Sequence, residues 1–125
     1  MKKYLRLVIL AISVITIFSG AMQIVAPAFV LHFVGVQIDD ATKQLFATIG
    51  MFMFLFGCMM VHALYDENDN RVVVLWSAAQ KLGASIAVGI GIFKGIFALP
   101  AAGVALFDFG SGILFFYYLK SLKAE

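Results

Sequence analysis

The chain has 125 residues, of which 63% are hydrophobic and only 13% are charged, and its formal net charge is +2 at pH 7. A soluble domain is usually about 45–50% apolar, so this composition excludes an ordinary soluble globular protein. The small positive charge does not provide the strongly basic surface that nucleic-acid binding requires. The single Cys excludes an intramolecular disulfide and a CxxC redox pair.

Four apolar stretches fill nearly the whole chain. A helix needs roughly 20 apolar residues to cross the hydrocarbon core of a bilayer, and each stretch reaches that length. We therefore predict an all-α integral membrane four-helix bundle with up-down topology, in which residues 1–125 form a single transmembrane domain. The expected spans are residues 4–26, 45–65, 72–97 and 101–119.

The three connections between the spans differ in character. Pro27 interrupts the first span, and the mostly apolar stretch from there to Gln37 predicts a short interfacial helix over the mouth of the bundle, because backbone at this depth must be hydrogen-bonded or shielded. Residues 65–71 form a short acidic turn. Leu99 and Pro100 predict a tight hairpin, so that the third and fourth spans are antiparallel neighbours.

The basic residues set the expected orientation, because Lys and Arg near the ends of spans favour the cytoplasmic side. With four spans, both termini and the second connection share one side of the membrane. That side carries Lys2, Lys3, Arg6, Arg71, Lys120 and Lys123, whereas the other side has Lys43 and Lys94. We therefore predict a multi-pass protein of the cell inner (plasma) membrane with cytoplasmic N- and C-termini.

Small residues mark the expected contacts between helices. Lipid provides no hydrophobic drive for helices to associate, so close approach of backbones at small residues is important. In the third span small residues recur every four positions, which predicts a stripe that faces into the bundle. The members of this stripe are Gly83, Ala87, Gly91 and Gly95, and Gly50 and Gly57 form a smaller version in the second span.

Ionisable residues inside spans are costly and are candidates for function. Asp108 lies in the fourth span and Lys94 near the end of the third. Counting from the hairpin gives these two residues a similar depth, so we expect a Lys94–Asp108 pair. A structural ion pair that locks the hairpin and a proton-transfer, ion-binding or ligand-binding role are both open interpretations. In a third, Lys94 extends to the outer interface and Asp108 pairs with another group. Lys94 also shares the face of the glycine stripe, which favours a buried position for it.

Three further polar residues join the candidate set. Gln23, near the outer end of the first span, and His32, in the interfacial segment, are expected to complete an outward-facing cluster with Lys94 and Asp108. Lys81 faces away from Lys94. We expect it to extend to the cytoplasmic interface, or else to bind an anionic headgroup or the carboxylate of a partner.

The sequence indicates no metal site and no cofactor, although a quinone or a lipid is a candidate ligand. His62 and Cys58 lie one turn apart, but structural zinc needs four ligands and catalytic zinc usually three. His32 and His62 are expected on opposite membrane faces, which argues against a haem held by two His. No phosphate-binding loop, dinucleotide fingerprint or hydrolase motif is present.

The overall plan resembles the DoxX-like group of small four-helix bacterial membrane proteins. The resemblance covers most of the chain and rests on the four-span layout, on Lys81-Leu82-Gly83-Ala84-Ser85 in the glycine-rich third span, and on Leu106-Phe107-Asp108-Phe109 in the fourth. Some members of that group are associated with quinone-linked oxidoreductase complexes. The resemblance therefore implies a membrane subunit, and it assigns no functional residue.

Three functions follow from these observations. The first is a non-enzymatic membrane subunit or accessory protein, whose partners are the lipid bilayer and another membrane protein or further copies of this chain. The second is a small transporter or channel with Asp108 and Lys94 on its path. The third is an enzyme with a membrane-soluble substrate, in which Asp108 is the acid or base. A pocket between helices favours the second or third, and a dry, packed bundle favours the first.

Overall fold

The computed structural model describes residues 2–122 and is all-helical over this range. Its helices are α1 (Lys2–Val25), α2 (Pro27–Phe33), α3 (Asp40–Leu64), α4 (Arg71–Phe93) and α5 (Ala101–Ser121). All except α2 are long and apolar enough to cross a membrane. The predicted four-helix bundle with up-down topology and a short helix between the first two spans is therefore confirmed.

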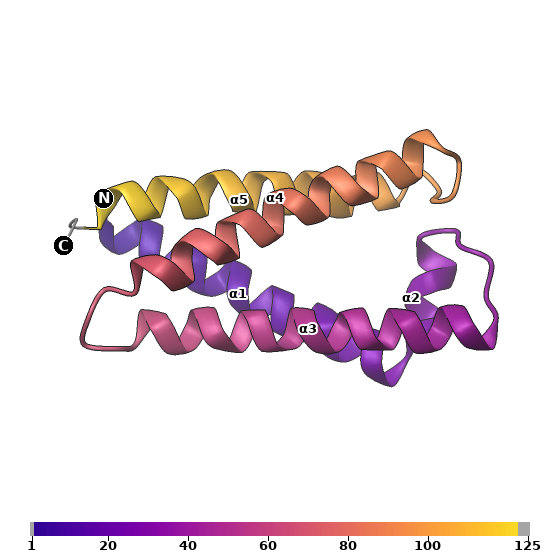
Figure 1. Cartoon of the computed structure of the whole chain (residues 1–125), viewed down its shortest axis with the longest axis horizontal. Helices are drawn as coiled ribbons and strands as arrows, with labels where there is room; N and C mark the ends of the chain where they lie inside the picture. The colour runs from indigo at the N-terminus through magenta and orange to yellow at the C-terminus, as the bar shows by residue number, and fades with distance from the viewer. Residues whose placement is uncertain (1, 123–125) are drawn as a thin grey trace.

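The long helices form two closely packed pairs, α1 with α3 and α4 with α5 (Figure 1). The connection between α3 and α4 lies at the same end of the bundle as the two termini, and we call this the terminal end. The short helix α2 and the connection between α4 and α5 lie at the opposite end, which we call the α2 end (Figure 1). The hairpin at Pro100 makes α4 and α5 neighbours, as predicted.

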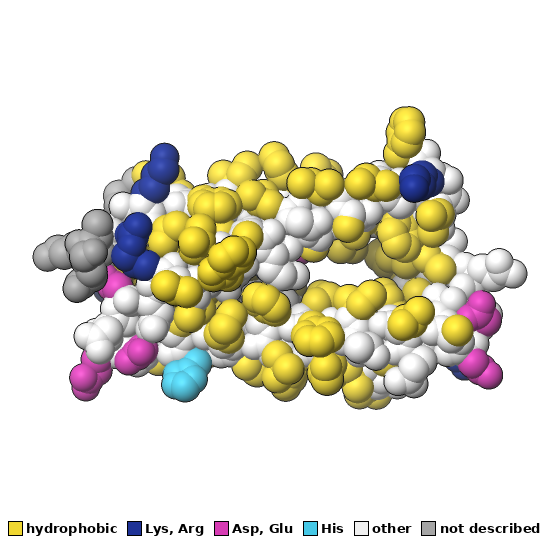
Figure 2. Space-filling model, in the orientation of Figure 1, with side chains coloured by type: hydrophobic (Ala, Val, Ile, Leu, Met, Phe, Trp, Pro, Cys, Tyr) yellow, Lys and Arg dark blue, Asp and Glu magenta, His cyan; other side chains and the backbone are white. Residues whose placement is uncertain are grey.

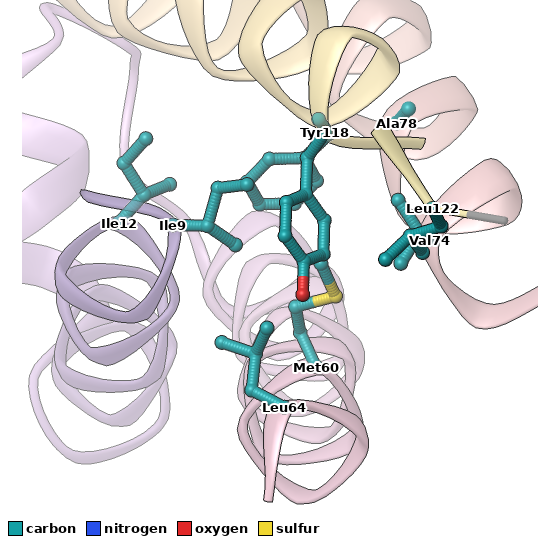
Figure 3. Packing of buried hydrophobic residues seen from close by; sticks show 9 residues of the cluster. Ile9, Ile12, Met60, Leu64, Val74, Ala78, Tyr118 and Leu122 are labelled. Atoms are coloured by element: carbon teal, nitrogen blue, oxygen red, sulfur yellow. The ribbon is translucent and has the colours of Figure 1, made fainter. Parts of the chain in front are cut away.

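The two pairs are held together by an apolar cluster at the terminal end (Figure 3). Every long helix contributes buried side chains to this cluster, and burial of apolar atoms in close contact gains dispersion energy even in lipid. Its members are Ile9, Ile12, Met60, Leu64, Val74, Ala78, Phe115, Tyr118 and Leu122. Towards the α2 end the pairs diverge (Figure 1), so the bundle is closed at one end and open at the other.

Glycines allow α1 and α3 to approach closely. A Cβ atom added to Gly20 would lie 2.5 Å from the Gly50 carbonyl oxygen and 2.6 Å from the Phe54 backbone nitrogen. Gly57 is likewise covered by Ile17 of α1. Gly50 and Gly57 thus pack against a neighbouring helix as the sequence predicts.

The stripe predicted on the third span is different, because all its members except Gly91, which Phe97 covers, are exposed. A Cβ atom added to Gly83 would meet nothing within 4 Å, and Ala87 is exposed. The buried face of α4 instead carries polar residues, including Ser77, Lys81 and Ser85. Lipid offers no hydrogen bonds to such groups, so turning them inward outweighs the close packing that the small residues offer.

The helix α4 ends at Phe93, earlier than predicted, because Gly95 has a φ of 75°. The Gly95 N–H donates to the Ile92 carbonyl at 3.0 Å, and the Ile96 N–H donates to the Gly91 carbonyl at 2.8 Å. This pair of bonds is the Schellman motif, which terminates a helix at a left-handed glycine.

The helix α2 ends in the same way at Gly35, whose φ is 74°. Just before it, the Val34 carbonyl accepts a hydrogen bond of 2.7 Å from the Ala98 N–H, in the connection between α4 and α5. The helix α2 directly follows α1, which belongs to the α1–α3 pair. This bond therefore connects α2 to the hairpin of the α4–α5 pair. It places α2 across the gap between the pairs.

We expect Gly20→Ala to lower the free energy of unfolding by about 1–3 kcal/mol, because the added methyl group collides with the α3 backbone. The matched control is Gly83→Ala, which adds the same atom in open space and replaces a poor helix former. Thermal unfolding in detergent measures both. Equal stability of the two variants would contradict the close approach of α1 and α3.

Candidate functional site

A cavity of about 420 Å³ lies between the two helix pairs at the α2 end. The space-filling view shows the hollow between the pairs on the side of α2 (Figure 2). Its volume falls in the range of about 300–1,000 Å³ that is usual for small-molecule sites. The apolar side chains that line it are Ile15, Met22, Val30, Phe33, Val34, Met53, Pro100, Val104 and Phe107.

A buried ion pair lies at the closed end of this cavity. The Nζ atom of Lys81 in α4 is 3.4 Å from Oδ1 of Asp108 in α5, and it donates a hydrogen bond of 2.5 Å to Oγ1 of Thr16 in α1. Lys81 is 4% exposed and Asp108 is 7% exposed. The ammonium also lies 5.3 Å from the centroid of the Phe107 ring, a favourable distance for a cation–π contact.

Thr16 is oriented for this role by its own helix. Its hydroxyl donates to the Ile12 carbonyl one turn earlier, at 2.9 Å. Because the hydroxyl proton is used in this bond, an oxygen lone pair is left to accept from Lys81. The ion pair is thus connected to α1, so that three of the four spanning helices meet at the Lys81 ammonium.

A polar row on α1 runs from the ion pair toward the α2 end. Thr16, Ser19 and Gln23 follow one another at i, i+3 and i+7, and all three line the cavity. Residues at this spacing share one face of a helix. The buried Gln23 side chain donates from Nε2 to the Phe46 carbonyl of α3 at 3.1 Å. The cavity therefore has apolar walls with one polar strip.

The structure brings together only some of the residues predicted for the site. Asp108, Gln23 and Lys81 line the cavity, whereas Lys94 and His32 are exposed and do not. From α2 the cavity receives apolar side chains instead, which are Val30, Phe33 and Val34.

The predicted Lys94–Asp108 pair is wrong, because Lys81 takes that position. The depth count assumed that the third span continues to the hairpin, but α4 ends at Phe93 and Lys94 is its C-cap residue. Lys81 extends to a carboxylate inside the bundle rather than to the interface, since a partner at hydrogen-bond distance satisfies its charge where it lies.

Sequence reasoning missed Thr16 and Ser19. A hydroxyl residue in an apolar span commonly bonds its own helix backbone, as Thr16 does. A single Thr or Ser in a span therefore does not by itself indicate a functional site. The detectable signal was the spacing of Thr16 with Gln23, which puts Thr16, Ser19 and Gln23 on one face of the first span.

The terminal end holds a second, smaller hollow of about 180 Å³, and several of the polar groups in and beside it make structural contacts. Arg6 donates to the Leu64 carbonyl at the end of α3. Arg71 donates to the Leu119 carbonyl at 3.0 Å, at the end of α5. In the adjoining turn, a hydrogen bond from Asn70 holds the pKa of the Asp66 carboxyl below its usual value. These contacts cap helix ends, where carbonyls lack partners.

No family model, no curated protein and no solved structure matches this chain. The candidate site therefore rests on the geometry of the cavity and its ion pair. Among residues 2–122, no group of three or more His, Cys, Asp and Glu side chains lies close enough to hold a metal ion.

We expect Asp108→Asn to lower the free energy of unfolding by about 3 kcal/mol, because it leaves the buried Lys81 ammonium without a counter-charge. Adding Lys81→Met should restore much of the loss, since the double variant buries no charge. The matched control is Lys94→Met, which alters an exposed Lys and should change little. A double-mutant cycle read by thermal unfolding checks this, and additive effects would contradict a direct pair.

Proposed function

We propose that this small multi-pass membrane protein binds an amphipathic molecule in the cavity between its two helix pairs. The observation that carries the proposal is the combination of apolar walls with a buried ion pair at the closed end. Ligand sites typically consist of an apolar pocket with a few placed polar groups that fix orientation. The apolar walls fit the ligand's body, and the polar strip fits its head.

Access from the bilayer supports the same proposal. Ile15, Met22 and Val104 line the cavity, and 49%, 45% and 39% of their respective surfaces are exposed. A ligand that dissolves in lipid reaches the cavity without passing through water. Its tail can remain among lipid chains while its head lies at the ion pair. Lipids and quinones have this general shape.

An accessory-subunit role is the second candidate, and the outer face of α4 favours it. Gly83 of the stripe expected to pack inside the bundle is turned outward, and Gly89 of the same helix likewise has open space where a Cβ would be. Small residues on a lipid-facing surface let another helix approach closely. Membership of the DoxX-like group stays a prediction, as does a place in a quinone-linked complex. Stoichiometric co-purification of another membrane protein from native membranes would favour this role.

The proposed orientation places the terminal end in the cytoplasm. Arg6 and Arg71 belong to that end, whereas Lys43 and Lys94 lie at the α2 end. The bias in Lys and Arg is the physical signal for orientation.

A matched pair of single-cysteine variants tests this orientation. In a Cys58→Ser background, Gln37→Cys marks the α2 end and Glu67→Cys marks the terminal end, and both native residues are exposed. We expect a membrane-impermeant maleimide to label the first in intact spheroplasts and the second only after permeabilisation. Labelling in the reverse order would place the termini outside.

A cavity-filling substitution tests the binding function. Gly103 lines the cavity, and a Cβ atom added there meets nothing within 4 Å, so Gly103→Leu should fill the space without disturbing the helices. Gly110→Leu is the matched control, because Gly110 is on the same helix and also open but does not line the cavity. Organic extracts of the gently purified proteins are compared by mass spectrometry.

We expect a small molecule to co-purify with the unmodified protein and with Gly110→Leu, and to be reduced at least about tenfold in Gly103→Leu, which corresponds to a loss of about 1.4 kcal/mol in binding. Identical extracts from all three proteins would count against a ligand in this cavity.

A further inference from the structure

The ionisable groups that line the cavity cancel in formal charge. Among residues 2–122, Lys81 and Asp108 are its only ionisable lining residues, and they pair with each other at 3.4 Å. The remaining polar lining side chains are Thr16, Ser19 and Gln23, all neutral. A charged ligand head would therefore meet no uncompensated opposite charge. It would have to displace one partner of the pair and leave that partner buried and unpaired, which is costly.

The site has hydrogen-bond acceptors that are not used within the protein. Within residues 2–122, no group donates to Oδ2 of Asp108, because its one hydrogen bond from Lys81 goes to Oδ1. The Gln23 amide uses Nε2 to donate to α3, which leaves its carbonyl oxygen to accept. The Ser19 hydroxyl, which is exposed beside the cavity, both donates and accepts.

Donors complement these acceptors: besides the Ser19 hydroxyl and the second N–H of the Gln23 amide, one lies at the ion pair. A Lys ammonium carries three N–H groups, and the Lys81 ammonium directs hydrogen bonds to Thr16 and Asp108. No acceptor among the described residues takes the third. A ligand group that both donates and accepts, such as a hydroxyl, fits between Oδ2 of Asp108 and this N–H.

We infer that the cavity selects an uncharged, hydroxyl-bearing head group on an apolar tail. This inference rests on the proposed binding function and specifies its chemistry. The hydroxyl donates to Asp108 and accepts from Lys81, so the ion pair stays intact. Any further hydroxyl on the head meets Ser19 or Gln23 along the polar row of α1. Alcohols, phenols and glycerol-type lipids share this head chemistry.

The test uses probes that share one tail and differ in head charge. Purified protein in phosphatidylcholine nanodiscs binds tritiated tetradecanol, and unlabelled tetradecanol, tetradecyl sulfate and tetradecyltrimethylammonium compete with it. The sulfate keeps its negative charge and the ammonium its positive charge at any working pH. Gly103→Leu defines the signal that comes from partition into lipid, and Gly110→Leu is its control.

We expect tetradecanol to compete at least about tenfold better than either charged probe, a difference of about 1.4 kcal/mol. In Asp108→Asn the order should reverse in favour of tetradecyl sulfate, since the Lys81 charge then lacks a counter-charge. A merely structural ion pair would not change which head group is preferred. If Asp108→Asn does not fold, the ranking of the three probes on the unmodified protein decides the inference by itself.

The outcomes separate the two proposals. If a charged probe competes best and Gly103→Leu still removes binding, the head-group inference is wrong and the cavity remains a binding site. If Gly103→Leu leaves the signal unchanged, tetradecanol does not occupy this cavity. Both the head-group inference and the proposed binding site then fail.

Discussion

The burial of the Lys81 ammonium inside an apolar bundle is the constraint on which the rest of the structure depends. A charge in the hydrocarbon region needs a partner at contact distance, and Asp108 is that partner. This requirement fixes which face of α4 turns inward and the register of α4 against α5. With the Thr16 hydroxyl as a further acceptor, it also links the second helix pair to the first.

The open cavity follows from how the two pairs are joined. At the terminal end, side chains from all four long helices fill the space between the pairs. At the α2 end the pairs are bridged by α2 and by the backbone bond between Val34 and Ala98. These contacts connect the two pairs, but they do not fill the space between them with side chains. The ion pair lies between these two regions, which explains why a charged group in the membrane also faces a cavity.

The two helix pairs use small residues in opposite ways. In the first pair, Gly20 and Gly50 bring the backbones of α1 and α3 together, which makes this pair a firm wall for the cavity. In the second, Gly83 of α4 faces outward, and Gly103 of α5 leaves room inside the cavity. The same residue type thus permits contact in one place and keeps space open in another. Whether a glycine permits contact or keeps space open is decided by its neighbours in space, rather than by its spacing along the chain.

The sequence by itself determined the membrane class, the four spans, the antiparallel α4–α5 hairpin and the short helix after Pro27, because hydrophobic length and helix-breaking residues act locally. It also indicated that Asp108 is a candidate site residue. Only the tertiary structure decided that the partner of Asp108 is Lys81, that Thr16 completes the contact and that Lys94 is exposed. Those outcomes depend on the rotation and end point of α4. The competition between burying polar groups and packing glycines sets the rotation, and a left-handed glycine sets the end point. A single sequence shows both the polar residues and the glycines of α4, but it does not show whether burying the former or packing the latter is the stronger effect.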